Sequence, residues 1–157
     1  MNGEARRKLL RRIPSGLYVI GVRRDAELHA FTASWLMQTS ITPPAVVLGV
    51  RRRSRVLALL TPGSHLSVNF VGKDDRALVQ HFFTRGCDDR LAGIPVRVGR
   101  TGAPILEQAI GYLECEVRAV VDEFGDHAPI IAEVVEAGLV RDVEPLIMND
   151  TPWHYGA

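Results

Sequence analysis

Residues Tyr112–Val121 read YLECEVRAVV and carry the clearest strand pattern in this chain. Apolar side chains take every second position, at Leu113, Cys115, Val117, Ala119 and Val121, and polar side chains stand opposite, at Glu114, Glu116 and Arg118. Neighbouring side chains of a strand point to opposite faces, so this alternation predicts a strand with one face in the core. Cys115 is therefore expected to be a small core residue.

Strand patterns dominate the sequence on both sides of this segment. Alternating or continuous apolar runs predict further strands at Gly16–Val22, Leu28–Trp35, Ala45–Val50, Leu66–Phe70, Ile130–Val140 and Pro145–Met148. Short helices are expected at Glu4–Ile13, from an N-cap at Ser54 to Leu60, and after Asp74-Asp75 with Leu78, His81 and Phe82 facing inward. Strands and helices do not alternate regularly, which favours an antiparallel barrel over a doubly wound parallel sheet.

Composition limits the classes of protein to consider. A chain of 157 residues with 46% hydrophobic and 24% charged residues fits one globular domain, which we expect to span 1–157 with an N-terminal helix at 1–13. The net charge of +1 gives no case for binding nucleic acid or a membrane surface. Two cysteines cannot form a disulfide scaffold, and no metal-ligand pattern occurs. No signal peptide or apolar span is found, so a soluble cytoplasmic protein is expected.

Nucleotide-binding motifs are also missing. The sequence has no G-x-G-x-x-G and no G-x-x-x-x-G-K, so any NAD(P)H would not be held in a Rossmann crevice. Two other segments carry candidate chemistry. Phe31–Trp35 is the hydroxyl-rich end of a predicted strand, and a predicted irregular loop at Gln38–Ile41 follows it. Arg51–Ser54 stands before a predicted helix, where it is either a phosphate site or a solvated turn.

The stretch FTASWLMQTSITPP at Phe31–Pro44 resembles the flavin-contacting signature of the flavin reductase-like family, whose fold is the FMN-binding split barrel. It is most similar to the version in flavodiiron proteins and rubredoxin-linked reductases. Further matches follow in the family's order, at Val68-Asn69, Leu78–Phe82, Thr101–Leu106, Tyr112–Cys115, Gly125–His127 and Trp153–Gly156. The resemblance implies a mainly β protein with an antiparallel split β-barrel and short peripheral helices.

The resemblance also implies a set of FMN-binding residues. They are Thr32, Ala33, Ser34, Trp35, Gln38, Thr39, Ser40, Ile41, Arg52, Arg53, Ser54, Arg55 and Asn69. The arginine turn and Ser34 would bind the phosphate, and Gln38–Ile41 would border the isoalloxazine ring. His127, which follows Gly-Asp, is the candidate catalytic residue that faces the ligand. Val56 stands where many members of the family have threonine, which leaves the individual phosphate contacts open.

Structural roles for the same residues remain alternatives. Trp35 fits core or dimer packing as well as stacking on a ring, and Asn69 fits local backbone bonding. His127 on its own reads as a surface-turn histidine, and His29, His65 and His81 read as structural or exposed. The C-terminal segment Trp153–Tyr155 would then only close the barrel.

Two functions follow from the resemblance. One is an oxidoreductase that passes hydride from NADH or NADPH to bound FMN, with a monooxygenase or another electron-acceptor protein as its partner. The other is an FMN-binding electron-transfer module with little NAD(P)H activity. In either case, the protein aligns and tunes its cofactor. Family resemblance and the apolar residues Phe31, Trp35, Leu9, Leu10 and Ile13 predict a homodimer.

Overall fold

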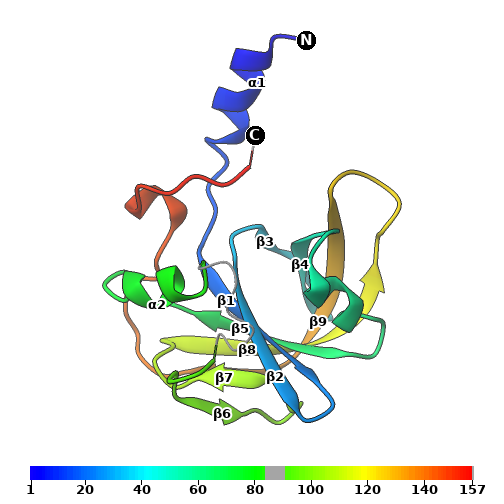
Figure 1. Cartoon of the computed structure of the whole chain (residues 1–157), viewed down its shortest axis with the longest axis vertical. Coiled ribbons are helices and arrows are strands. Elements are labelled where there is room, and N and C mark those ends of the chain that lie inside the picture. Colours follow the sequence, from blue (N-terminus) through cyan, green and yellow to red (C-terminus); the bar gives the residue numbers. More distant parts are fainter. Residues whose placement is uncertain (84–90, 157) are drawn as a thin grey trace.

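A single antiparallel sheet forms most of the computed structural model, which describes residues 1–83 and 91–156 (Figure 1). Its strands are β1 (Tyr18–Arg24), β2 (Glu27–Ala33), β3 (Leu36–Ile41), β4 (Pro44–Arg51), β5 (His65–Phe70), β8 (Gly111–Val120) and β9 (His127–Leu139), in the order β2-β1-β5-β8-β9-β4-β3. The sheet curls until β2 approaches β4, and its two edge strands are not hydrogen-bonded to each other. The expected antiparallel barrel is therefore confirmed, open at one seam.

The interior of the barrel is filled by alternate side chains of its strands. Ile20, Leu48, Leu66, Val68 and Ile130 are all fully buried there. Cys115 joins them as expected, and burial raises the pKa of its thiol to about 12. Cys87 lies outside the described residues.

A second core lies outside the barrel wall. There the helix α2 (Arg76–His81) and the short strand pair β6 (Val96–Val98) and β7 (Pro104–Leu106) cover the sheet. Leu78 and Phe82 point inward as predicted, whereas the prediction for His81 was wrong, because this side chain is exposed. A helix of six residues has a narrow buried side, and Val79 shares it in place of His81.

The chain enters and leaves the barrel at the same place. Gly16 and Ile147 form an isolated β-bridge, and the Met148 N–H donates to the Ser15 carbonyl at 2.9 Å. Only bridges form where a strand was predicted at Pro145–Met148, and the single-turn 3-10 helix η2 (Met148–Asp150) follows.

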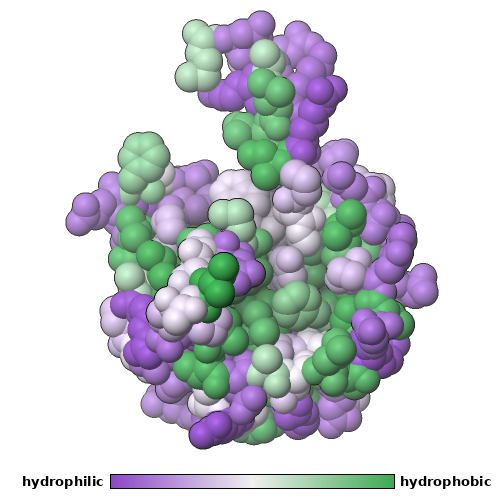
Figure 2. All heavy atoms as spheres, turned by 180° about the vertical axis from the view of Figure 1, so that it is seen from behind, coloured by the Kyte–Doolittle hydropathy of each residue, from purple (hydrophilic) through white to green (hydrophobic). Residues whose placement is uncertain are grey.

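Helix α1 (Gly3–Leu10) stands away from the barrel, beside the C-terminal segment (Figure 1). The Asn2 side chain caps it by accepting from the Glu4 and Ala5 N–H groups, and no residue of the helix is buried. Figure 2 shows an apolar side and a hydrophilic side on this helix. The apolar side includes Leu9 and Leu10, which are 62% and 48% exposed.

Candidate functional site

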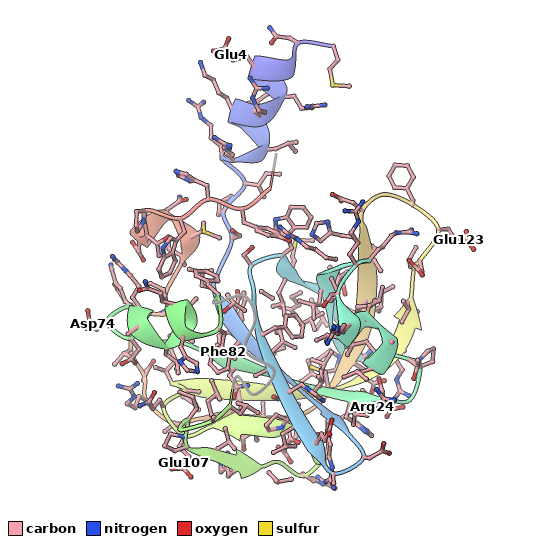
Figure 3. The ribbon with its side chains drawn as sticks, viewed as in Figure 1. Glu4, Arg24, Asp74, Phe82, Glu107 and Glu123 are labelled. Carbon is pink, nitrogen blue, oxygen red and sulfur yellow. The ribbon has the colours of Figure 1, made fainter. Side chains whose placement is uncertain are left out.

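A hollow of about 630 Å³ opens where β2 ends and β4 leads into the arginine turn. One wall contains Thr32, Ala33, Ser34 and Trp35. Phe82, which Figure 3 labels at the end of α2, lies on another wall together with residues of the C-terminal segment. The hydroxyl-rich strand end that the sequence singled out therefore borders a cavity.

The strand end is fixed by contacts on both sides. The Thr32 hydroxyl donates to the Val79 carbonyl of α2 at 3.1 Å, and Ser34 is only 7% exposed. Trp35 packs on Gly49, where an added Cβ would lie 3.2 Å from the Trp35 side chain. The Gly49 N–H donates to the Trp35 carbonyl at 2.8 Å. A residue with a side chain at position 49 would therefore have to displace the indole.

Only part of the arginine turn borders the cavity. Arg53 and Ser54 line the hollow, whereas Arg52 and Arg55 do not. Arg52 instead pairs with Asp122 at 3.2 Å through Nη1. Ser54 begins the 3-10 helix η1 (Arg55–Leu59), and its Oγ accepts from the Val56 N–H at 3.3 Å. The predicted N-cap is confirmed, and the Ser54 hydroxyl keeps its own hydrogen for donation.

A cluster of four side chains, Trp35, Arg51, His127 and Tyr155, stands at the edge of the cavity. His127, the first residue of β9, lies opposite Arg51 of β4 in the sheet register. Its ring packs on Trp35 with centroids 4.4 Å apart, and its Nε2 lies 2.7 Å from the Tyr155 hydroxyl oxygen. Tyr155 in turn accepts from Arg51 Nε at 2.6 Å. His127 is not itself a lining residue, but it touches two residues that are.

Hydrogen-bond donors in this cluster can be assigned. The Asp126 carboxylate, which only accepts, lies 2.8 Å from His127 Nδ1, so Nδ1 carries the hydrogen. This hydrogen bond lowers the pKa of Asp126. When the imidazole is neutral, Nε2 has no hydrogen, so the Tyr155 hydroxyl, which accepts from Arg51, donates its own hydrogen to Nε2. Both ring nitrogens of His127 are therefore already engaged.

Gln38–Ile41 form a strand, so the loop expected there was a wrong prediction. They belong to β3, which has only β4 as its partner and has a bulge between Gln38 and Ser40. Ile41 is 84% exposed, and neither Gln38, Thr39, Ser40 nor Ile41 lines the hollow. The structure thus places this segment at an open sheet edge and does not bring it to the other predicted flavin residues within one chain.

Asn69 lies in the core, away from the hollow. Its Nδ2 donates to the Val19 carbonyl at 3.0 Å and to Ser67 Oγ at 3.1 Å, and its Oδ1 accepts from the Leu106 N–H at 2.8 Å. The side chain is fully buried. These bonds correspond to the structural alternative, in which Asn69 serves the backbone.

A second hollow of about 640 Å³ lies on the other side of the C-terminal segment. Leu10 and Ile13 border it from the N-terminal arm, and Met37 borders it from β3. Trp35 and Tyr155 line both hollows, so they stand between them. Leu10, Ile13 and Trp35 at this second hollow are among the apolar residues from which the sequence predicted a homodimer.

Arg51 and Tyr155 are the members of the cluster absent from the expected binding set. Arg51 lies 104 positions from Tyr155 in the chain, so spacing gives no sign that they meet. The arginine run and the match at Trp153–Gly156 were the available signals.

Among residues 1–83 and 91–156, no group of three histidine, cysteine or acidic side chains could hold a metal ion. The helices in the same ranges are all too short or too polar to cross a membrane.

Comparisons with known proteins give one consistent result. Residues 10–155 match the flavin reductase like domain. Diflavin flavoprotein A 1 of Synechocystis sp. (strain ATCC 27184 / PCC 6803 / Kazusa) is 31% identical over 138 residues, which cover 85% of this chain and 24% of that protein. The chain thus spans about a quarter of the curated relatives' length.

Two solved structures extend the comparison. The flavin reductase HpaC, complexed with NADP+, aligns with a TM-score of 0.82 and 26% identity over 97% of each chain. The FMN-binding protein from Thermus thermophilus aligns with a TM-score of 0.73 and 27% identity, over 82% of this chain and 72% of that one. A family match over nearly the whole chain, an antiparallel split barrel and a cavity at the signature strand lead to one conclusion: this chain belongs to the flavin reductase like family.

Proposed function

We propose that this chain binds FMN in the hollow beside Trp35 and reduces it with NADH or NADPH. The observation that carries the proposal is the meeting of Thr32–Trp35 with Arg53 and Ser54 around one cavity. The first segment is the signature strand, and the second offers a cation and a hydroxyl to a phosphate group.

Size and chemistry of the hollow fit this cofactor. Its volume of about 630 Å³ lies within the range of small-molecule sites, about 300–1,000 Å³. Trp35 and Phe83, both about 40% exposed, offer apolar surface to a ring system, and Arg53 offers the bidentate fork that suits phosphate. When bound, FMN would supply the hydride-accepting ring.

The chain's own residues bind and orient in this proposal. Arg53 and Ser54 would hold the phosphate end, and the strand end at Ala33-Ser34 would border the ring. Thr32 is anchored to α2 through Val79, which keeps that strand end in place. Hydride transfer between stacked rings needs alignment and no acid–base side chain, so fixed walls are what this reaction requires.

Names of similar proteins support both the reductase and its alternative. HpaC is a flavin reductase solved with NADP+, and the Thermus protein is named for binding FMN. The relative named as a diflavin flavoprotein favours the second candidate, an FMN electron-transfer module within a longer chain. Rapid mixing of the FMN-loaded protein with NADH and NADPH separates them. Saturating reduction by either is expected, and slow, non-saturating reduction by both would refute the reductase while leaving the module.

The phosphate assignment has a matched pair of variants in the same turn. Arg53→Ala is expected to weaken FMN binding about 10- to 100-fold, because one charge-assisted contact contributes about 1.5–3 kcal/mol. Arg52→Ala, which removes the partner of Asp122, is expected to change affinity much less. Riboflavin lacks the phosphate and should bind both variants as it binds the parent. Equal FMN affinity of all three proteins would contradict the assignment.

A homodimer completes the proposal. Gln38–Ile41 lie on an exposed edge of β3, so they reach a flavin only when a second copy brings its own cavity to that edge. Leu9, Ile13 and Met37 are each more than 60% exposed, and a subunit contact would cover them. Reduced flavin would then pass its electrons to a partner monooxygenase or another acceptor protein.

A further inference from the structure

We propose that the hydroxyl of Tyr155 occupies a binding position for a ligand oxyanion, which a phosphate oxygen takes when the C-terminal segment withdraws. The position is formed by Arg51 and His127. Their nitrogens Nε and Nε2 lie 2.6 and 2.7 Å from one oxygen atom, that of the phenol. Two nitrogens converging on one oxygen is the geometry by which proteins bind a phosphate or carboxylate oxygen.

The segment that carries Tyr155 is lightly attached. Its last backbone hydrogen bonds within the described residues run from the Thr151 N–H to the Met148 carbonyl and from the Trp153 N–H to Thr151 Oγ1. Trp153 is still packed on Phe83, with ring centroids 4.7 Å apart, so the part that withdraws begins after it. That part is held by the Tyr155 hydroxyl and by contacts of the Tyr155 ring with Trp35, His127 and the Arg51 guanidinium. A segment held by side chains opens at little cost in free energy.

Trp35 and Tyr155 stand between the two hollows, so withdrawal of the segment would join them. It would also free both nitrogens at once, and one of them belongs to Arg51, which itself lines the first hollow. The exposed position then lies next to the cavity in which a phosphate-bearing ligand is proposed to bind.

The exchange of phenol for oxyanion also moves a proton. With a neutral imidazole, the phenol gives its hydrogen to His127 Nε2, whereas an ionised phosphate oxygen has none to give. Nε2 therefore takes up one proton from solvent as the oxyanion binds, and Nδ1 keeps its bond to Asp126. Arg51, which bonds to the same phenol oxygen, is the other charged group at this ring. Arg51 and the imidazolium then both donate to the bound oxygen.

Tyr155→Phe tests the exchange, because it keeps the ring contacts and deletes only the competing oxygen. Losing about two net hydrogen bonds from the closed state should tighten FMN binding roughly 5- to 30-fold. Riboflavin affinity should stay unchanged. Gly156→Ala should act in the same direction, since its φ is +87° and a Cβ there would lie 2.7 Å from the Trp35 ring. Tyr112→Phe is the matched control, because that tyrosine also packs under an arginine, Arg97, but far from the hollow.

Pyrophosphate is a second probe, which tests this inference separately from the proposed function. The inference rests on that function only for the identity of the ligand, FMN. Sodium pyrophosphate is titrated into each protein while the ring nitrogens of His127 are followed by NMR. Protonation of Nε2 at lower pyrophosphate concentration in Tyr155→Phe than in the parent is expected, and loss of that response in Arg51→Ala/Tyr155→Phe. Unchanged or weaker binding of FMN and pyrophosphate in Tyr155→Phe would overturn the exchange, as would an equal gain for riboflavin. Failure of every variant to bind flavin, with the pyrophosphate response intact, would overturn only the proposed function.

Discussion

Replacing Asn69 by alanine should destabilise the fold and leave the flavin site intact. The variant removes the acceptor of the Leu106 N–H, at 2.8 Å, and the donor to the Val19 carbonyl, at 3.0 Å, in a fully buried position. An orphaned buried group costs about 1–3 kcal/mol, and the space left by the amide adds to this. We therefore expect a loss of about 2–4 kcal/mol in the free energy of unfolding. At about 2–4 °C per kcal/mol for a domain of this size, Tm should fall by roughly 5–15 °C.

Urea denaturation followed by circular dichroism measures the loss, and FMN titration well below Tm measures the site. Ser67→Ala is the milder comparison, because it removes the hydroxyl that donates to the Pro104 carbonyl at 2.5 Å and one acceptor of Asn69 Nδ2. The Leu106 N–H and the Val19 carbonyl keep their bonds to Asn69 in this variant. Ser67→Ala should cost about 1 kcal/mol. An Asn69→Ala protein that unfolds like the parent but binds FMN more than tenfold more weakly would refute the structural role.

Three further outcomes are expected. Burial raises the pKa of Glu114, but hydrogen bonds from the Thr101 hydroxyl and from the Thr101 and Arg100 N–H groups outweigh it and lower the pKa overall. A lowered folded-state pKa stabilises the fold above the unfolded-state value, about 4.3, and this contribution disappears as pH falls through the folded value. Glu114→Gln should therefore lower the free energy of unfolding by about 1–3 kcal/mol at pH 7 and by less in acid. Urea denaturation of parent and variant at several pH values measures this difference, and a difference that does not change with pH would contradict the prediction. In a Cys87→Ser background, Cys115 should not react with a thiol reagent until the protein unfolds, because its pKa is about 12 and its side chain is buried; rapid labelling of folded protein would show otherwise. Light scattering should give about 35 kDa, twice the 17.3 kDa chain, with a Tm that rises on adding FMN, whereas a monomer that binds FMN tightly would exclude the dimer.

Strands with one buried face could be predicted from the sequence, because alternation of side chains is a local signal. Val117 and Arg118 of β8 show it plainly, one fully buried and one exposed. Strand β3 could not be predicted in this way, because an edge strand with most of its side chains exposed has no alternating pattern to detect. The short strands β6 and β7 were missed for a related reason, since three residues are too few to establish a period.

The alternating pattern of β8 also gave a wrong prediction for the burial of one carboxylate. Glu114 was expected on the polar face of its strand, but it is 1% exposed. A bulge between Glu114 and Cys115 shifts the register there, and the loop at Gly99–Thr101 folds over the carboxylate and donates to it. Neither the bulge nor the loop contact has a signature in the residues around position 114.

Some residues of the candidate site have a local signal in the sequence, and others do not. Thr32–Trp35, Arg53 and Ser54 are near neighbours in sequence or carry a recognisable motif, so they could be predicted to belong together. The meeting of Arg51, His127 and Tyr155 depends on the pairing of β4 with β9 and on the path of the C-terminal segment. Such contacts join distant parts of the chain, so they cannot be predicted from the spacing of residues in one sequence.

The bond between Ser15 and Met148 has a consequence for how this domain can be combined with others. Because the barrel begins and ends at one point, a host polypeptide could run in at Ser15 and out at Met148 without stretching around the domain. A linker joining these two points would be short and would cost little closure entropy. Circular permutants that join these two points and open the chain at an exposed turn such as Arg24–Glu27 should therefore keep the barrel, and the same domain can be carried as a cassette inside a longer protein.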